Sequence, residues 1–433
     1  MKNTTIGMNF CWNPSDSNAL EKYVDYIDWC DKHKIKIIRI IFSKWGLNCI
    51  YNKKDVITLK HIVHYASTKN INIIISLLNF TDFNKINYLD INDKNFSWNF
   101  NKYQPIDKKV SSFFKKINNV LVEDINYVLD SIIEYNNIKF IEIMNEIDQV
   151  NCNDNVLINW CNKLINILSK KYQKYIFTCS ISNYQKYDLY REKLNCYVDL
   201  HFYSFPSESA FENLQYAMKT YKEILYFGEY AKNSDYSYID DYGSKLYFTS
   251  GLWGSYFLKL TYSAMSWWWD DIIINSDYER IIDFYNTNIL NFQFDGFEEM
   301  STEELSIEYN NNSTDKHIHE INKIVERIIN LLKHPLFIFN ELKNIRKFLS
   351  RKLKKEKSLK VYKIWSKSKK IFYIECNEEC IIDLKNLLLN KKFYVYDLIK
   401  CTKKIVNIRE KSKINVYGCY ILEEKEKKHK LVV

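Results

Sequence analysis

Short apolar runs alternate with longer amphipathic stretches over the first 300 residues of the chain. The runs are rich in β-branched residues, as strands are, and the stretches between them repeat apolar residues at helical spacing. Eight strands are predicted, at Ile6 to Cys11, Ile35 to Phe42, Ile71 to Leu78, Lys139 to Met144, Tyr175 to Ile181, Tyr197 to Tyr203, Ile224 to Gly228 and Tyr262 to Trp267. Repeated strand–helix units of this number predict an α/β fold, a (β/α)8 TIM barrel. A doubly wound open sheet is the alternative, but no glycine-rich phosphate loop follows an early strand to support it.

The pattern changes after residue 300. Two helical stretches are predicted at 315–332 and 336–357, and short strand-like runs without helices between them follow from residue 359. Helix-free strands at this spacing indicate a small antiparallel β-sandwich. We therefore expect a barrel over residues 1–300, a helical and basic connecting segment over 301–357, and a β-sandwich domain over 358–433.

Composition supports a folded protein of this size. The chain has 433 residues, of which 46% are hydrophobic and 16% aromatic, so a large core can form and wholesale disorder is excluded. The 11 cysteines form no CxxC pair, which argues against a disulfide framework or a zinc ribbon and favours small core residues in a reducing compartment. With no secretory signal pattern and no apolar run long enough to span a bilayer, a cytoplasmic location without a membrane span is predicted.

Charge is distributed unevenly along the chain. Residues 331–433 carry 27 Lys and Arg against 11 Asp and Glu, whereas residues 1–330 have a net charge of −7. The basic run RKLKKEK at 351–357 suggests an anionic surface or a nucleic acid as a partner. Because lysine is spread through the whole C-terminal part, a solvated helix is the preferred interpretation, and no nucleic-acid partner is expected.

Two carboxylates stand at the ends of predicted barrel strands, where the reacting groups of such barrels lie. Glu146 ends the fourth run and Glu229 directly follows the seventh. A glutamate after a strand is usually a solvated loop residue, and either one alone would be read in that way. Strands four and seven, however, face each other across a barrel of eight. The pair is therefore predicted to act on one substrate atom from opposite sides, as glycoside hydrolysis requires.

Several neighbours strengthen this hypothesis. Arg39 lies inside an apolar run, where a barrel interior accepts a charge only if it is paired, although an Arg pointing outward between helices is the alternative. His201 and Tyr203 alternate on strand six and are placed to orient Glu229, with a buried structural His as the alternative. An indole face can stack on a sugar ring, and three successive indoles cannot all be core residues. Those three residues are Trp267, Trp268 and Trp269.

Taken together, these motifs resemble a known family. The segments are GMNFCW at 7–12, EIMNEID at 142–148, SGLW at 250–253 and SWWWD at 266–270. With Asn-Glu after strand four, Gly-Glu after strand seven and Trp after strand eight, residues 5–290 resemble the retaining glycoside hydrolases of clan A, the cellulase and mannanase superfamily. The resemblance is closest to a bacterial branch similar to glycoside hydrolase family 5.

The resemblance implies a role for each matching residue. It implies Glu146 as acid/base, Glu229 as nucleophile and Asn145 as the residue that holds the sugar 2-hydroxyl, with Arg39, His201 and Tyr203 around the nucleophile. It further implies a β-linked oligo- or polysaccharide as substrate and no cofactor or metal. The third strand ends in SLLN at 76–79, without the His often found there, and residues 316–357 match nothing in the family. Two rivals remain: a non-catalytic carbohydrate-binding barrel and a binder of anionic surfaces that uses the basic C-terminal part.

Overall fold

The computed structural model shows two compact units. One consists of Met1–Phe205 with Asn213–Leu290, and the other of Pro206–Glu212 with Asn291–Val433. The residues that the structure describes are 4–10, 18–44, 48–49, 53–80, 83, 110–203, 210–220, 226–231, 242–267, 269–289, 292, 296–299, 306–309, 359–365, 371–383, 392–407 and 413–424. The helices expected at 315–332 and 336–357 lie outside them, and the expected domain boundaries at 300 and 357 stay a prediction.

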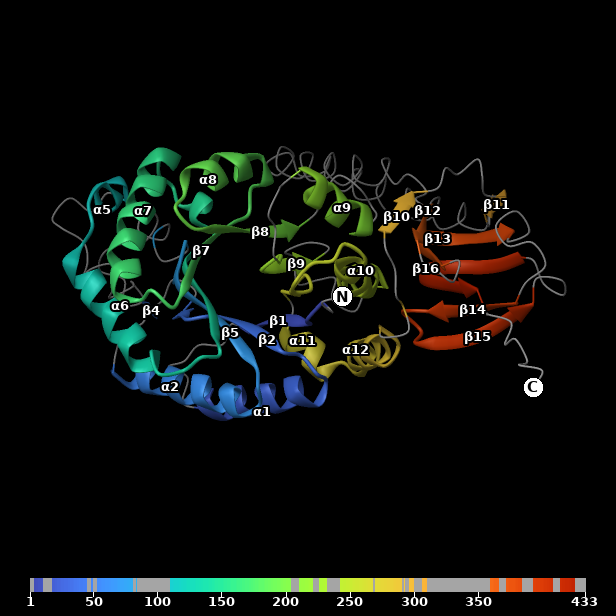
Figure 1. Ribbon diagram of the computed structural model, residues 1–433, viewed down its shortest axis with the longest axis horizontal. Coiled ribbons are helices and arrows are strands. Elements are labelled where there is room, and N and C mark those ends of the chain that lie inside the picture. Colours follow the sequence, from blue (N-terminus) through green and yellow to red (C-terminus); the bar gives the residue numbers. More distant parts are fainter. Residues whose placement is uncertain are drawn as a thin grey trace, which may run out of the picture. The chain divides into compact units, whose positions relative to one another are not determined.

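Seven parallel strands form the wall of the first unit. They are β1 (Gly7–Phe10), β2 (Ile37–Ile41), β5 (Asn72–Asn79), β6 (Ile138–Asn145), β7 (Ile176–Ile181), β8 (Tyr197–Tyr203) and β9 (Glu229–Ala231). They pair in the order β1-β2-β5-β6-β7-β8-β9, and helices lie outside them (Figure 1). All five residues of β2 are buried, as expected for parallel strands that are covered on both faces.

Residues 262–266 occupy the eighth position of the barrel. Tyr262 forms a parallel bridge to Thr5, and Ser266 forms parallel bridges to both Met8 on β1 and Tyr230 on β9. The segment therefore connects the first strand to the last, and the (β/α)8 architecture is confirmed. The eighth element consists of isolated bridges instead of the continuous strand expected at 262–267, and β9 begins at Glu229, directly after the run expected to form it.

Helices separate the barrel strands along the chain. Their bounds are α1 Ala19–Lys32, α2 Lys53–Thr68, α5 Val110–Lys115, α6 Asn119–Ile132, α7 Asp154–Lys171, α8 Tyr187–Lys193, α9 Ala210–Thr220, α10 Tyr242–Phe257, α11 Trp269–Ile274 and α12 Ser276–Asn288, with 3-10 turns at Ile147–Gln149 and Tyr184–Lys186 and a small hairpin of β3 (Ser43–Lys44) and β4 (Asn48–Cys49). Asparagine side chains cap α6, α7 and α12 by accepting a backbone N–H of the first turn. None of the helices described is both long and apolar enough to cross a membrane.

A cluster of buried hydrophobic residues fills part of the first unit. It consists of Ile37, Ile74, Phe140, Tyr226 and Met265, with Tyr262 packed against it. These residues come from β2, β5, β6 and the chain around β9 and the eighth position, so the barrel is a packed core and not a pore. On β2 the polar Arg39 stands two residues beyond Ile37, toward the carboxyl ends of the strands. A charged side chain therefore lies between the apolar cluster and the carboxyl ends of the strands.

The second unit is an antiparallel sheet, which confirms the expected C-terminal β-domain. Its strands are β10 (Gly296–Glu299), β11 (Ser306–Tyr309), β12 (Leu359–Trp365), β13 (Ile371–Asp383), β14 (Lys392–Asp397), β15 (Thr402–Asn407) and β16 (Lys413–Glu424). Hydrogen bonding links them into one sheet in the order β10-β12-β13-β16-β14-β15, with β11 paired to β13. Alternate residues of β13, among them Phe372 and Ile374, join one buried cluster with Val395 and Leu422.

Candidate active site

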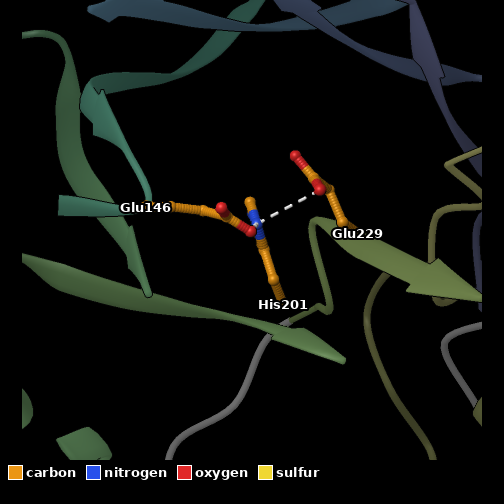
Figure 2. Close-up of side chains that lie close together, drawn as sticks. All are labelled: Glu146, His201 and Glu229. Carbon is orange, nitrogen blue, oxygen red and sulfur yellow. Dashed lines mark hydrogen bonds and ion pairs between the residues drawn. The ribbon is translucent and has the colours of Figure 1, made fainter. Parts of the chain in front are cut away.

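Two glutamates from opposite sides of the barrel meet at the carboxyl ends of its strands. Glu146 directly follows β6, and Glu229 is the first residue of β9. Side-chain ligand atoms of Glu146, Glu229 and His201 all lie within 4.8 Å of one another, and Figure 2 shows the three side chains converging on one space. The structure thus brings together the two carboxylates that the sequence analysis paired.

The backbone around Glu146 turns sharply to aim this side chain. Its φ and ψ of 50° and 54° are left-handed, which is uncommon for a residue with a side chain. The Glu146 N–H donates to Oγ of Ser180 on β7 at 2.9 Å, which supports this conformation. Burial raises the pKa of Glu146, and the nearby charge of Glu229 adds to the rise, whereas the hydrogen bond with His201 opposes it. With 13% of its side chain exposed, Glu146 is the more accessible of the two carboxylates.

Glu229 is held from two sides by hydrogen-bond donors. The Tyr203 hydroxyl donates to Oε2 at 2.5 Å, and Nη1 of Arg39 donates to Oε1 at 3.1 Å. The side chain is 4% exposed. The two glutamates therefore stand in different surroundings: Glu229 accepts hydrogen bonds from a hydroxyl and a guanidinium, whereas burial raises the pKa of Glu146.

Arg39 is fully buried and organises the floor of the site. Its guanidinium binds Glu142 on β6 through two hydrogen bonds, Nε to Oε2 at 2.8 Å and Nη2 to Oε1 at 3.0 Å. It also donates to Oδ1 of Asn145 at 2.8 Å and to Oδ1 of Asn9 at 3.0 Å. Although burial alone would raise the pKa of Glu142, the Arg39 charge holds that pKa below its ordinary value. The buried charge is paired, as the sequence analysis required of an inward-facing Arg39.

Glu142 and Asn9 were not predicted as site residues. Glu142 is a second charge inside an apolar strand, and that unusual position was the available signal. Asn9 on β1 uses its amide to join distant parts of the barrel, since Nδ2 donates to the carbonyls of Gly228 at 2.7 Å and Ser266 at 3.1 Å. No local pattern marks this role, because these two carbonyls are more than 200 residues away in sequence.

His201 lies between the two glutamates. Its Nδ1 is 2.9 Å from Oε1 of Glu146 and 3.4 Å from Oε2 of Glu229 (Figure 2). Its Nε2 is 3.6 Å from Oδ2 of Asp199. Burial by itself would lower the pKa of His201, but the charge of Glu229, the nearby Asp199 carboxylate and the hydrogen bond with Glu146 raise the pKa to about 10. The ring was expected beside Glu229, yet its shortest contact is with Glu146. Asp199, fully buried behind the ring, is a further residue that sequence reasoning missed.

The structure describes two of the three successive tryptophans at 267–269. Trp267 and Trp269 are buried and pack edge to face with ring centroids 5.3 Å apart, while Trp268 lies outside the described residues. The backbone N–H of Trp267 donates to the carbonyl of Tyr230, the residue after Glu229, at 3.3 Å. This bond places the backbone of Trp267 at the same end of the barrel as the carboxylates.

A cation site uses the same kinds of ligand atom, carboxylate oxygens and an imidazole nitrogen, that Glu146, His201 and Glu229 bring together here. A cation there would displace the proton shared by His201 and Glu146 and would lie close to the Arg39 guanidinium, which is 3.1 Å from Glu229. Both effects oppose metal binding. The arrangement is better suited to moving a proton and stabilising positive charge on an organic substrate.

Solved structures with this fold are known among carbohydrate-cleaving enzymes. A protein described as a glycoside hydrolase matches at 9% identity with a TM-score of 0.51 over 98% of this chain and 92% of its own. A glycoside hydrolase of family 5 from Bacteroides vulgatus matches at 9% identity with a TM-score of 0.50 over 98% of this chain and 89% of its own. No protein-family model and no curated protein sequence matches the chain. At this level of identity the likeness establishes the fold.

Proposed function

We propose that the protein is a retaining glycoside hydrolase that cleaves a β-linked oligo- or polysaccharide with two glutamates. The observation that carries the proposal is the meeting of Glu146 and Glu229 within 4.8 Å in unlike surroundings. Retaining enzymes hold their carboxyl groups ~5 to 5.5 Å apart, whereas inverting enzymes leave ~6.5 to 9.5 Å for a water molecule. A separation of at most 4.8 Å between single oxygens of the two carboxylates is in keeping with the shorter, retaining arrangement.

The surroundings assign the two roles. Glu229, anionic and bound by Arg39 and Tyr203, attacks the anomeric carbon while the protonated Glu146 donates its proton to the leaving oxygen. The products of this step are a glycosyl ester on Glu229 and a free alcohol. Glu146, now ionised, removes a proton from water, which attacks the same carbon and releases Glu229 as a carboxylate.

Other side chains act on the substrate or on the two glutamates. Arg39 fixes the Asn145 amide by binding its Oδ1, and the long 3.5 Å bond from Asn145 Nδ2 to Asn79 is one that a sugar 2-hydroxyl can replace. His201 and Tyr203 hold Glu146 and Glu229 in place. The assignment of Trp267, Trp268 and Trp269 to sugar stacking stays a proposal, and the burial of Trp267 and Trp269 against each other leaves little of these two indoles exposed for it.

Activity and stereochemistry test the proposal together. The full-length protein is screened on aryl β-glycosides and soluble β-linked polysaccharides, and the first-formed anomer is followed by proton NMR. We expect hydrolysis with a β-anomer formed first. An α-anomer formed first would overturn the retaining mechanism. Failure to cleave any substrate, combined with saturable binding of the same polysaccharides, would favour a non-catalytic carbohydrate-binding barrel.

Binding to anionic surfaces, the other alternative function, is tested separately. The C-terminal part is basic, and binding through it to a polyanion such as heparin would weaken steeply with salt. Such binding would be the same for the wild type and for a Glu146→Gln, Glu229→Gln double variant. Tight salt-sensitive binding without any glycosidase activity would replace the proposed function with this one.

A further inference from the structure

Asp148 is a buried carboxylate two residues after Glu146, and the reaction proposed above does not use it. Only 6% of it is exposed, and it is the middle residue of the 3-10 turn Ile147–Gln149 that directly follows Glu146. Each carboxylate oxygen accepts a backbone N–H just beyond β7, Oδ1 from Ser182 at 3.0 Å and Oδ2 from Asn183 at 2.9 Å. Asp148 therefore fastens the turn after Glu146 to the neighbouring strand through two charge-assisted hydrogen bonds.

This connection lies beyond the backbone pairing of β6 with β7. The last pair of the two strands in the described chain is Glu142 with Thr178. Further toward the carboxyl ends, side chains link the two segments: Ser180 accepts the Glu146 N–H, and Asp148 accepts the two amides after β7. The left-handed backbone of Glu146 is an uncommon conformation, which persists where the surroundings hold it. Of these two side chains, Asp148 is the charged one.

Asp148 also acts on Glu146 through its charge. Burial is the main cause that raises the pKa of Glu146, the charges of Glu229 and Asp148 add to the rise, and His201 opposes it. Burial raises the pKa of Asp148 itself, while its two backbone hydrogen bonds and the charges of Lys186 and His201 oppose that rise. The same carboxylate thus bears on both the position and the protonation of Glu146.

We propose that Asp148 is the positioning residue of Glu146, which it keeps aimed at the leaving oxygen by holding the turn after Glu146 against the end of β7. The inference rests on the proposed function, because aiming a proton donor matters only where a leaving group must be protonated. Its effect should therefore be confined to substrates whose leaving group needs a proton.

Asp148→Asn tests the proposal, because an amide has a similar size but can accept only one of the two N–H groups through its oxygen. Two β-glycosides of the sugar that the wild type cleaves are compared, one with an alkyl and one with a dinitrophenyl leaving group. We expect kcat/KM to fall ~100-fold or more on the alkyl glycoside and less than ~5-fold on the dinitrophenyl glycoside. On the alkyl glycoside the alkaline limb should move to lower pH, because a lost negative charge favours ionised Glu146.

Asp154→Asn is the matched control. Asp154 begins α7 and accepts hydrogen bonds from the Tyr190 hydroxyl at 2.7 Å and from Nζ of Lys186 at 3.0 Å. This variant also removes a negative charge near Lys186, but it leaves the two amides bound by Asp148 in place. We expect kcat/KM to change less than ~2-fold on both glycosides, as for a side chain outside the network around Glu146.

A second measurement separates positioning from a general loss of structure. Added to Glu146→Ala, the Asp148→Asn change should alter azide-rescued turnover less than ~2-fold, because the carboxyl group that it positions is already absent. Asp148→Ser, which keeps one acceptor oxygen, is the second variant if Asp148→Asn loses its fold by circular dichroism.

The outcomes distinguish this inference from the proposed function. A wild type without glycosidase activity would overturn the proposed function, and this inference with it. With an active wild type, equal losses on the two glycosides, an alkaline limb that stays in place, an equal loss in Asp154→Asn or a further loss in the Glu146→Ala background would each overturn the inference alone.

Discussion

Gly228 and Asp199 are hydrogen-bonded to each other next to Glu229, the predicted nucleophile. The Gly228 N–H donates to Oδ1 of Asp199 at 2.8 Å, and a β-carbon on Gly228 would lie 1.9 Å from Oδ2 of the same side chain. Only glycine fits at this position without a shift. Since Asp199 also contacts His201, a displacement here reaches both the imidazole and Glu229, the next residue in the chain.

The first prediction is that Gly228→Ala lowers kcat/KM by ~100-fold or more, because a misplacement of about 1 Å is enough for a loss of this size. Steady-state kinetics on an aryl β-glycoside provides the measurement. Gly251→Ala is the matched control, since the nearest atom to its added β-carbon is a Tyr230 ring carbon at 2.8 Å, farther than the carboxylate at Gly228. A loss of kcat/KM in Gly228→Ala no larger than that in Gly251→Ala would contradict the importance of the Gly228–Asp199 contact.

The second prediction separates the roles of the two glutamates. Glu229→Ala should abolish turnover of all substrates, because no nucleophile remains. Glu146→Ala should keep activity on aryl glycosides with good leaving groups, which depart without a proton, and added azide should restore turnover by forming a glycosyl azide. Kinetics on a series of leaving groups checks both statements. Equal loss in the two variants without azide rescue would show that the roles are wrongly assigned.

The third prediction concerns pH. Glu146 must be protonated to act as an acid, and burial raises its pKa, so the alkaline limb of the kcat/KM profile should lie above the pH expected for an ordinary glutamate. The His201 hydrogen bond and charge lower the pKa of Glu146. His201→Ala removes both, so the alkaline limb should move to higher pH in this variant whatever happens to kcat. A limb that stays in place or moves to lower pH would refute the coupling.

The fourth prediction concerns stability and the buried pair of Arg39 and Glu142. Glu142→Gln should reduce the free energy of unfolding by ~3 to 5 kcal/mol at pH 7, because it leaves a fully buried guanidinium without its main partner. Urea unfolding measures this difference. Glu134→Gln is the control, since the Lys60–Glu134 pair is 47% and 59% exposed and should contribute little to stability.

The pH dependence of this difference has a definite sign. The pKa of Glu142 is lowered in the folded state, so its stabilising contribution is present above its unfolded pKa and is lost as pH falls through the folded value. The wild type and Glu142→Gln should therefore approach equal stability in acid, below the ordinary glutamate pKa of ~4.3. A difference that grows as pH falls would contradict this account.

Much of the barrel could be predicted because local pattern and local structure agree in it. The runs over β2, β5, β6, β7 and β8 are mainly apolar, as expected for strands buried on both faces, with single polar or charged residues inside them. The eighth element was harder to predict: residues 262–266 belong to the barrel through three isolated bridges, to Thr5, Met8 and Tyr230. Such pairing depends on distant strands being in place, which a periodicity of apolar residues cannot reveal.

The sequence by itself determined where the candidate carboxylates stand. Their positions after the fourth and seventh strands follow from counting strands, and barrel geometry then places Glu146 and Glu229 opposite each other. The inward-facing Arg39 could be predicted for the same kind of reason, since a charge in a buried run requires a partner. These are consequences of order along the chain and of burial.

Only the tertiary structure decided which groups touch. It pairs Arg39 with Glu142 through two hydrogen bonds, sets His201 closer to Glu146 than to Glu229, and brings Asp199 behind the imidazole. Side-chain contacts between strands depend on register, twist and rotamer, and a shift of one residue would turn each of these side chains to the other face. Strand order therefore identifies the ends where chemistry occurs, whereas contacts across the barrel set the protonation states on which that chemistry depends.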